Sequence, residues 1–235
     1  MKKFTVYDDF KDIFPDACFG VVVVKNAKNT AADNAVFEQL LRSAEKESEK
    51  HALLEPLSAN PVVAEWREAF TKFKTKKGAR ASIEALLKRV KQGSRIRSIS
   101  PVVDIYNSIS LKYGVSCGAE DIDTFDGDLR LTVANGDEAF CLIDSEENQP
   151  PHPGEIVYKD NAGAVCRCFN WRESRRTMVT EKSRNVFMII EMPNSSRIET
   201  LKNAIDEMAA LVSRHISSEV AAHILTKENG SIALG

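Results

Sequence analysis

Four arginines lie close to a tryptophan in the segment "CRCFNWRESRRT", residues 166–177. Guanidinium groups bind phosphates and carboxylates through paired hydrogen bonds, and they stack on planar rings. If the segment recognises an anionic ligand, we expect Trp171, Arg172, Arg175 and Arg176 to contact it. The alternative is a strand end followed by a solvated, charged turn that has no recognition role.

Polar side chains near this segment are of types that orient water. Glu191 ends the apolar run "FMIIEM", where a carboxylate could hold a water molecule or an amine. The alternative for Glu191 is a strand end that faces solvent. Together with Asn170 and Thr177 it forms the predicted catalytic set, and Thr180 is predicted to contact the substrate.

The sequence offers little for other catalytic chemistries. None of the four histidines lies next to an obvious nucleophile, and the chain has no glycine-rich phosphate-binding loop. Cys166 and Cys168 supply only half of a zinc ligand set. We therefore expect no metal and no cofactor. The five scattered cysteines fit reduced thiols better than a disulfide framework.

Charge is segregated along a chain whose formal net charge is only −2. Residues 65–97 hold eleven Lys and Arg against three Asp and Glu, whereas residues 120–160 hold twelve acidic against two basic residues. A basic flank can bind a nucleic-acid backbone through its local field. We expect Arg89 and Lys91 to contact RNA; the alternative is that the basic and acidic regions are solvated faces that pair with each other.

The hydrophobic pattern positions these residues on a mixture of strands and helices. Continuous apolar runs at 19–26 and 185–192 predict strands buried on both faces. An Asn135-Gly136 turn between 128–133 and 138–144 predicts a β-hairpin. Four helices are expected in the first half of the chain, at 33–50, 60–73, 82–93 and 100–113. Ser196 and Glu199 form a predicted capping box for a last helix.

The length of 235 residues and the 43% hydrophobic content fit one large domain. We expect a single domain over residues 1–235, with an N-terminal strand and helix flank at 1–59 and a C-terminal helix at 195–229 packed on it. The opening residues lack the apolar stretch of a secretion signal, and no run is long enough to cross a bilayer. The expected compartment is therefore the cytoplasm, with no membrane partner.

An ordered series of segments resembles the free-standing B3/B4-domain proteins and the editing domain of the phenylalanyl-tRNA synthetase beta subunit. The series runs through residues 60–193 and includes "SPVVDIYNSISL", "GAEDID", "DLRLTVANGDEAF", "PGEIVYKD", "CRCFNWRESRRTMVT" and "NVFMIIEM". Two positions depart from the synthetase pattern. The family histidine aligns with Gly118, and the glycine-rich loop aligns with "NWRESRR", so tyrosine specificity does not carry over.

The resemblance implies an α+β fold with a sandwich-like β core covered by helices. It also implies hydrolysis, in trans, of a mischarged aminoacyl-tRNA by an oriented water molecule. The ligands would then be the 3′ end of a tRNA and the amino-acid moiety. Two alternatives stay open: a module that binds tRNA or an amino-acid-like ligand without catalysis, and an interaction protein whose arginine loop recognises an acidic partner.

Overall fold

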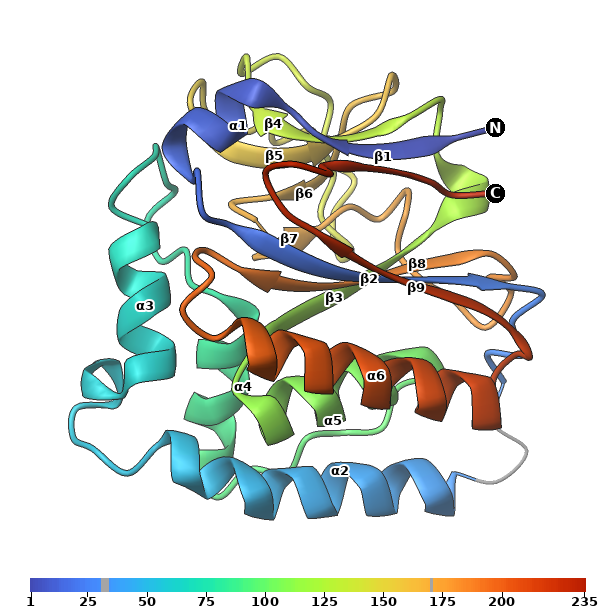
Figure 1. Ribbon diagram of the computed structural model, residues 1–235. Helices are drawn as coiled ribbons and strands as arrows, with labels where there is room; N and C mark the ends of the chain where they lie inside the picture. Colours follow the sequence, from blue (N-terminus) through green and yellow to red (C-terminus); the bar gives the residue numbers. More distant parts are fainter. Residues whose placement is uncertain (31–33, 170) are drawn as a thin grey trace.

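The computed structural model describes residues 1–30, 34–169 and 171–235. Within these residues, two β-sheets face each other, and helices cover the outer face of the smaller sheet (Figure 1). The larger sheet has the strand order β10-β1-β4-β5-β6-β7, and the smaller has the order β3-β8-β2-β9. The fold is therefore the predicted α+β sandwich.

The bounds of the elements follow from the backbone hydrogen bonds. The strands are β1 (Lys3–Val6), β2 (Cys18–Lys25), β3 (Ser116–Asp121), β4 (Leu129–Val133), β5 (Ile156–Lys159), β6 (Ala164–Arg167), β7 (Arg172–Glu173), β8 (Val186–Met192), β9 (Glu219–Leu225) and β10 (Ser231–Ala233). The α-helices are α1 (Asp8–Ile13), α2 (Ala35–Glu47), α3 (Pro61–Ala69), α4 (Ser82–Lys91), α5 (Pro101–Tyr113) and α6 (Ile198–His215). Short 3₁₀ helices span Ser48–His51, Leu57–Ala59 and Ile122–Thr124.

Strand β2 is buried on both faces because its sheet separates two hydrophobic cores. Phe19 and Val21 belong to the core between the sheets, whereas Val22 and Val24 belong to the core under α5 and α6. This explains why "FGVVVV" is continuously apolar rather than alternating. Gly20 lies under α6, where a Cβ atom would come within 3.1 Å of the Ile205 Cδ1 atom. The glycine therefore lets the helix lie close to the sheet.

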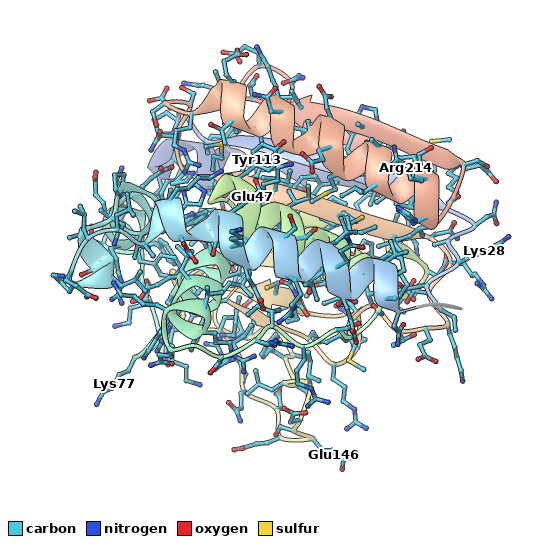
Figure 2. The ribbon with its side chains drawn as sticks, turned by 90° about the horizontal axis from the view of Figure 1, so that it is seen from below. Lys28, Glu47, Lys77, Tyr113, Glu146 and Arg214 are labelled. Carbon is cyan, nitrogen blue, oxygen red and sulfur yellow. The ribbon has the colours of Figure 1, made fainter. Side chains whose placement is uncertain are left out.

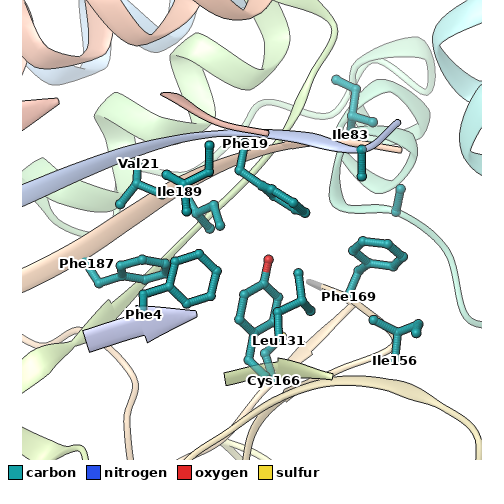
Figure 3. Packing of buried hydrophobic residues seen from close by; sticks show 14 of the residues in the cluster. Phe4, Phe19, Val21, Ile83, Leu131, Ile156, Cys166, Phe169, Phe187 and Ile189 are labelled. Atoms are coloured by element: carbon teal, nitrogen blue, oxygen red, sulfur yellow. The ribbon is translucent and has the colours of Figure 1, made fainter. Parts of the chain in front are cut away.

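Aromatic rings fill much of the space between the two sheets. Figure 3 shows Phe4 beside Phe187, with ring centroids 5.0 Å apart. Phe169 closes the end of this core near α3, where it meets Trp66 edge to face at 5.2 Å. Val63, Trp66, Phe70 and Phe73, from the helix predicted at 60–73 and the residues after it, pack on this core. The segment that follows Phe169 is therefore anchored at its start by aromatic packing.

The predicted hairpin at Asn135-Gly136 is wrong. Strand β4 is flanked by β1 and β5, so neither of its edges is left for residues 138–144, which form only isolated bridges. The turn itself is present, because the Glu138 carboxylate accepts hydrogen bonds from the backbone N–H groups of Asn135 and Gly136, both at 2.9 Å. The chain then runs as a loop to β5.

The C-terminal helix is shorter than expected. It ends at His215, and the residues that were predicted to continue it to 229 form β9 and lead to β10. The capping box is also wrong, since Arg197 is the N-cap residue and the Ser196 N–H donates to Asn194 Oδ1. The helix buries Leu201, Ala204, Ile205, Met208 and Val212.

Candidate functional site

A cleft of about 510 Å³ opens beside β3, the edge strand of the four-stranded sheet. Helix α4 and the loop before it contribute Arg80, Ser82 and Arg89 to the wall, and α5 contributes Tyr106 and Asn107. The opposite wall is the segment Trp171, Arg172 and Glu173, which includes the short edge strand β7. The cleft therefore lies where edge strands of the two sheets meet the helices.

The mouth of the cleft carries cationic side chains. The side chains of Arg89 and Arg172 are exposed, and neither forms a hydrogen bond or an ion pair with another described residue. The guanidinium carbon of Arg172 lies 5.0 Å from the centroid of the Trp171 ring. This stacked pair also lines a second hollow of about 460 Å³, formed with residues 142–145. The Trp171–Arg172 pair thus stands between two hollows and presents a planar cation to each.

The inner wall of the cleft is acidic. Burial raises the pKa of Glu173 to about 7. Glu120 lies behind it on β3, and its pKa is raised well above the ordinary range by burial first and by the Glu173 charge second. Burial, followed by the same two carboxyl groups, raises the pKa of Tyr106, which therefore remains a hydroxyl donor at neutral pH. Glu173 and Tyr106 line the cleft and are partly exposed, whereas Glu120 is buried and does not line it.

Several buried oxygen atoms near this wall lack hydrogen-bond partners. In the described part of the chain, these are Ser116 Oγ, Glu120 Oε2 and Thr177 Oγ1. The Thr177 hydroxyl lies close enough to the Glu120 carboxylate to favour its charged form, although the two do not form a full hydrogen bond. Leaving such groups unpartnered costs about 1–3 kcal/mol each. None of these three atoms belongs to a residue that lines the cleft, so the missing hydrogen bonds lie inside the protein.

The structure brings some of the predicted site residues together. Trp171, Arg172 and Arg89 line the cleft, and Thr177 is buried beside Glu120. Asn170 lies outside the described residues. Thr180 does not line the cleft; it is exposed in a loop, where its backbone oxygen accepts from Asn29 Nδ2 at 2.9 Å.

Glu191 is completely buried and faces the space between the sheets, so the alternative of a solvent-exposed strand end is wrong. It lies on β8 opposite Phe19 and Ser116, and the Tyr158 hydroxyl donates a hydrogen bond to its Oε1. Burial, with Glu191 as the second cause, raises the pKa of Tyr158, so the phenol keeps its proton. Glu191 is not among the residues of the cleft wall.

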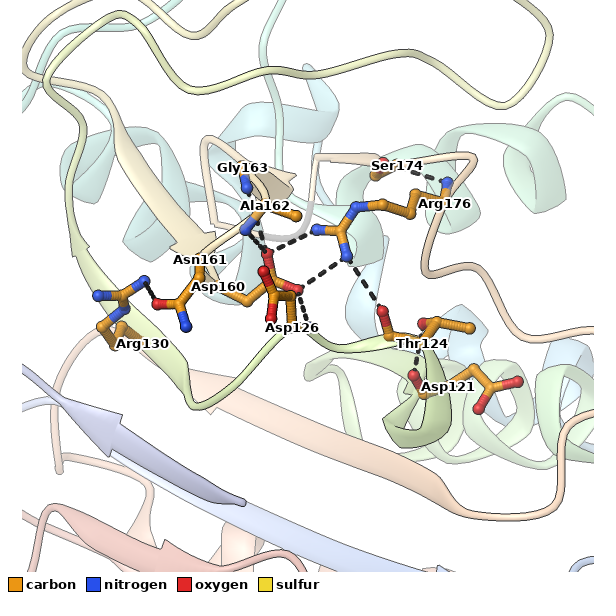
Figure 4. A network of polar contacts seen from close by, with 10 residues as sticks. All are labelled: Asp121, Thr124, Asp126, Arg130, Asp160, Asn161, Ala162, Gly163, Ser174 and Arg176. Atoms are coloured by element: carbon orange, nitrogen blue, oxygen red, sulfur yellow. Dashed lines mark hydrogen bonds and ion pairs between the residues drawn. The ribbon is translucent and has the colours of Figure 1, made fainter. Parts of the chain in front are cut away.

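Arg176 is committed to a structural contact, in contrast to the ligand-binding role expected for it. Its guanidinium binds Asp160 through two hydrogen bonds of 2.7 and 2.8 Å and also donates to the Thr124 carbonyl (Figure 4). Asp160 is buried and accepts further hydrogen bonds from the backbone N–H groups of Asp126, Ala162 and Gly163. This network holds the 172–178 segment against the loop after β3.

Arg175 points away from the cleft. It pairs at 3.2 Å with Glu146, on the loop that projects from the molecule in Figure 2. Both partners are largely exposed, so the pair contributes little to stability. Arg167, the first arginine of the cluster, is buried with Glu155 in a two-bond ion pair. Of the four arginines around Trp171, Arg172 is therefore the one that lines the cleft.

Lys91 lies on a different side of α4 from Arg89. Its ammonium group pairs with Glu55 and donates to the carbonyls of Ala52 and Leu54. Arg89 instead lines the cleft. The structure therefore separates these two residues: Arg89 lines the cleft, and Lys91 is bound to a neighbouring loop.

Sequence reasoning missed Glu173, Glu120, Tyr106 and Arg80. Glu173 stands inside the arginine cluster, and Glu120 stands in "GAEDID", where alternation along β3 puts it on the same face as Gly118. Strand β3 contains few apolar residues, so it was not predicted as a strand. The direction of the Glu120 side chain was therefore not predicted either.

In the described chain, no group of three His, Cys, Asp or Glu residues is placed to hold a metal ion. No described helix is long and apolar enough to cross a membrane.

The fold and the cleft define a class of protein: an α+β sandwich with a polar cleft at a sheet edge. Residues 65–226 match the model of the B3/4 domain, so the chain belongs to the B3/4 domain family. It is 34% identical over 67 residues to the phenylalanine–tRNA ligase beta subunit of Shewanella oneidensis, covering 28% of this chain and 8% of that protein. The same subunit of Idiomarina loihiensis is 32% identical over 95 residues, covering 40% and 12%.

Both relatives are much longer than this chain, which matches about a tenth of their length. Among solved structures, an N-terminal fragment of the phenylalanyl-tRNA synthetase beta subunit from Pyrococcus horikoshii aligns with 92% of this chain and 50% of that chain. The identity is 13% and the TM-score is 0.47.

Proposed function

We propose that this B3/4-family protein hydrolyses the ester bond of an aminoacyl-tRNA in trans, in the cleft beside β3. The observation that carries the proposal is Glu173, a carboxyl group with a pKa of about 7 in the wall of a cleft that has a cationic mouth. A general base works best when its pKa is near the working pH. The relationship to phenylalanine–tRNA ligase beta subunits supports an aminoacyl-tRNA as the substrate.

In the proposed reaction, the Glu173 carboxylate takes a proton from a water molecule. At the same time, the oxygen of that water molecule attacks the ester carbonyl carbon. The ester bond breaks, the ribose oxygen leaves with a proton, and the products are a free amino acid and a tRNA with an intact 3′ end. The Tyr106 hydroxyl is a donor available to the carbonyl oxygen, because its raised pKa keeps it protonated. No side-chain nucleophile is required.

The mouth residues would position the nucleic-acid end of the substrate. Arg172 would bind a phosphate through its planar fork, and Trp171 would stack on a base. Arg80 and Arg89 on the facing wall would add phosphate contacts. Correct positioning of the bound ester and the water molecule supplies a large part of the rate enhancement that we propose for ester hydrolysis.

The proposal assigns the base to Glu173 rather than to Glu191, the residue expected from the sequence. Glu191 is completely buried between the sheets and accepts a hydrogen bond from Tyr158, whereas Glu173 lines the cleft. Thr177 keeps a supporting role next to Glu120. A binding module without catalysis is the second candidate, since Gly118 brings no side chain to the position of the synthetase histidine.

The test is a panel of tRNAs, each charged with a different amino acid, incubated with the purified chain while loss of the ester is followed. We expect one group of aminoacyl-tRNAs to be deacylated much faster than without protein, and Glu173→Gln to lose most of that rate. Binding of charged tRNA without any deacylation would support the binding module. Absence of both would leave neither candidate standing.

A further inference from the structure

Helix α4 separates the cleft from another hollow of about 510 Å³, which we call the α4 hollow. Four α4 side chains at helical spacing line the cleft: Ser82, Ala85, Leu86 and Arg89. Four others, at similar spacing on another side of the helix, line the α4 hollow: Glu84, Lys88, Lys91 and Gln92. Arg80, in the loop before α4, lines both spaces. The cleft and the α4 hollow therefore adjoin at the N-terminal end of the helix.

The wall of the α4 hollow carries an excess of positive charge. It contains one acidic residue and four basic residues: Glu84, Arg67, Arg80, Lys88 and Lys91. Two of the cations are already in ion pairs, Arg67 with Glu84 and Lys91 with Glu55. The charges of Arg80 and Lys88 therefore lack a compensating acid in this wall.

Arg80 and Lys88 also keep hydrogen-bond donors available. Lys88 is exposed and forms no hydrogen bond or ion pair with another described residue. Arg80 donates through Nε to the Gly78 carbonyl at 3.3 Å, and its terminal nitrogens have no partner among the described residues. Charged donors of this kind form strong hydrogen bonds with phosphate oxygens. Both side chains can therefore bind an anion, and Arg80 can do so at the junction of the two spaces.

The hollow on the other side of the cleft, formed with residues 142–145, has the opposite charge balance. Its wall contains Arg172 as a cation, against the carboxyl groups of Asp144 and Glu173. Figure 2 shows that Lys77, in the loop before α4, and Glu146, in the loop after residues 142–145, project at different places on the molecule. A polyanionic strand that leaves the cleft is therefore attracted toward α4 and not toward residues 142–145.

We propose that the α4 hollow binds a phosphodiester group of the RNA strand whose 3′ end lies in the cleft. This inference rests on the proposed function and deepens it, because it assigns the path of the strand outside the cleft. The esterified 3′ end occupies the cleft, so the nucleotides that pass Arg80 are on its 5′ side. Arg80 binds a phosphate where the strand rounds the end of the helix, and Lys88 binds a phosphate in the hollow itself.

The width of α4 limits which phosphate reaches Lys88. A helix with its side chains is about 10–12 Å across. A stacked strand advances about 3.4 Å per nucleotide, so about three nucleotides pass from one side of α4 to the other. The phosphate at Lys88 therefore belongs to one of roughly the last four linkages of the strand.

The experiment removes the negative charge of one linkage at a time and asks whether Lys88 detects the change. The probe is an RNA hairpin with the acceptor-stem sequence of phenylalanine tRNA and a single-stranded 3′ end that carries no amino acid. One sequence is sufficient, because phosphate contacts do not read the bases. In a set of variant hairpins, a neutral methylphosphonate replaces one of the last linkages in turn. Fluorescence anisotropy then measures the affinity of each hairpin for the natural chain and for Lys88→Ala.

We expect one neutral linkage to weaken binding to the natural chain by about fivefold. Lys88→Ala should bind the unmodified hairpin about fivefold more weakly, and that same linkage should cause no further loss in the variant. The control is Lys202→Ala on α6, an exposed lysine that pairs with Glu199 and lines neither the cleft nor the α4 hollow. This variant should bind every hairpin as the natural chain does. Melting temperatures should be unchanged in both variants, because both lysines are exposed.

The proposal is overturned if Lys88→Ala binds the hairpins as tightly as the natural chain does. It is also overturned if the losses from Lys88→Ala and from every neutral linkage simply add, or if the natural chain does not bind the hairpin. Because the hairpins carry no ester, the result does not depend on catalysis. Coupling between Lys88 and a linkage, without deacylation of any aminoacyl-tRNA, would contradict only the proposed hydrolysis. Deacylation without coupling would contradict only this path of the strand.

Discussion

Glu173 is an ionisable residue whose side chain is only partly exposed to water. Burial favours the neutral acid over the carboxylate. Ionisation of Glu173 at high pH therefore lowers the free energy of unfolding. Its folded pKa of about 7 lies above the ordinary value of 4.5. The neutral Glu173 carboxyl group therefore makes its full contribution to the free energy of unfolding below pH 4.5. That contribution is lost as the pH rises through 7.

This sign gives a prediction for stability. A shift of about 2.5 pKa units corresponds to about 3 kcal/mol, and the partial exposure of the side chain reduces the expected effect to about 2 kcal/mol. Between pH 5 and pH 8, the free energy of unfolding of the natural protein should fall by that amount relative to Glu173→Gln. Urea unfolding at pH 5, 6, 7 and 8 measures it, with Glu146→Gln as the exposed control. Parallel curves for the natural protein and Glu173→Gln would show that Glu173 titrates normally.

The sequence could show that arginines gather around Trp171 but not which of them are free. Strand alternation stops after Arg167, because Cys168 and Phe169 have φ values of +50° and +57° and the chain turns. The partners of Arg167 and Arg176, which are Glu155 and Asp160, are supplied by other parts of the chain. Only the tertiary structure brings these partners to the arginines. It identifies Arg172 as the arginine of this cluster whose side chain has no hydrogen-bond or ion-pair partner among the described residues.

Helix α4 separates residues that the sequence grouped together. Arg89 and Lys91 are two positions apart, which is about 200° around a helix, so their side chains leave on nearly opposite sides. Arg89 reaches the cleft, and Lys91 reaches Glu55. Both were expected to contact RNA because charge alone, without the position of the neighbouring loop, does not separate them.

This geometry predicts different effects for two charge-matched substitutions. Arg89→Ala should weaken tRNA binding and reduce the slope of log affinity against log salt concentration by about 1, the loss of one phosphate contact. Lys91→Ala should leave that slope unchanged, since its ammonium is already paired. Affinities measured from 50 to 300 mM salt, about the range in which phosphate contacts dominate, give both slopes. A loss of slope in Lys91→Ala, or none in Arg89→Ala, would remove Arg89 from the RNA contact.

Helix α5 was predicted from its local pattern, whereas strands β9 and β10 were not predicted. Helix α5 begins at Pro101 and ends at Gly114 in the left-handed conformation, as its sequence signals indicate. Strands β9 and β10 lack such a signal: their exposed, mixed residues resemble a helix end, and their pairing with β2 and β1 comes from the start of the chain. Pairing across more than 190 residues is not visible in a local pattern.

At the scale of the whole molecule, these last strands join the two sheets. Strand β9 extends the four-stranded sheet beside β2, and β10 extends the six-stranded sheet beside β1 (Figure 1). Leu225 ends β9 fully buried in the core between the sheets. The C-terminal residues therefore help to hold the two sheets in the relative position that the cleft requires.

The corresponding prediction concerns Leu225. Leu225→Ala should lower the free energy of unfolding by about 2–5 kcal/mol, because it leaves a cavity between the sheets. The exposed Lys227→Ala, two residues further along, should change it by less than about 0.5 kcal/mol. Chemical denaturation of both variants provides the comparison. A loss below about 1 kcal/mol for Leu225→Ala would mean that β9 is not packed as described.

The central claim is that an aminoacyl-tRNA is held by Arg172 at the cleft and hydrolysed there. The most direct measurement is the single-turnover deacylation rate of the preferred aminoacyl-tRNA by Arg172→Lys and Arg175→Lys. The first variant keeps its charge but loses the two-bond, stacked geometry, so its rate should fall about tenfold or more. The second alters only an exposed pair with Glu146, so its rate should match the natural protein. Melting temperatures should be unchanged in both; equal rates for the two variants would contradict the account.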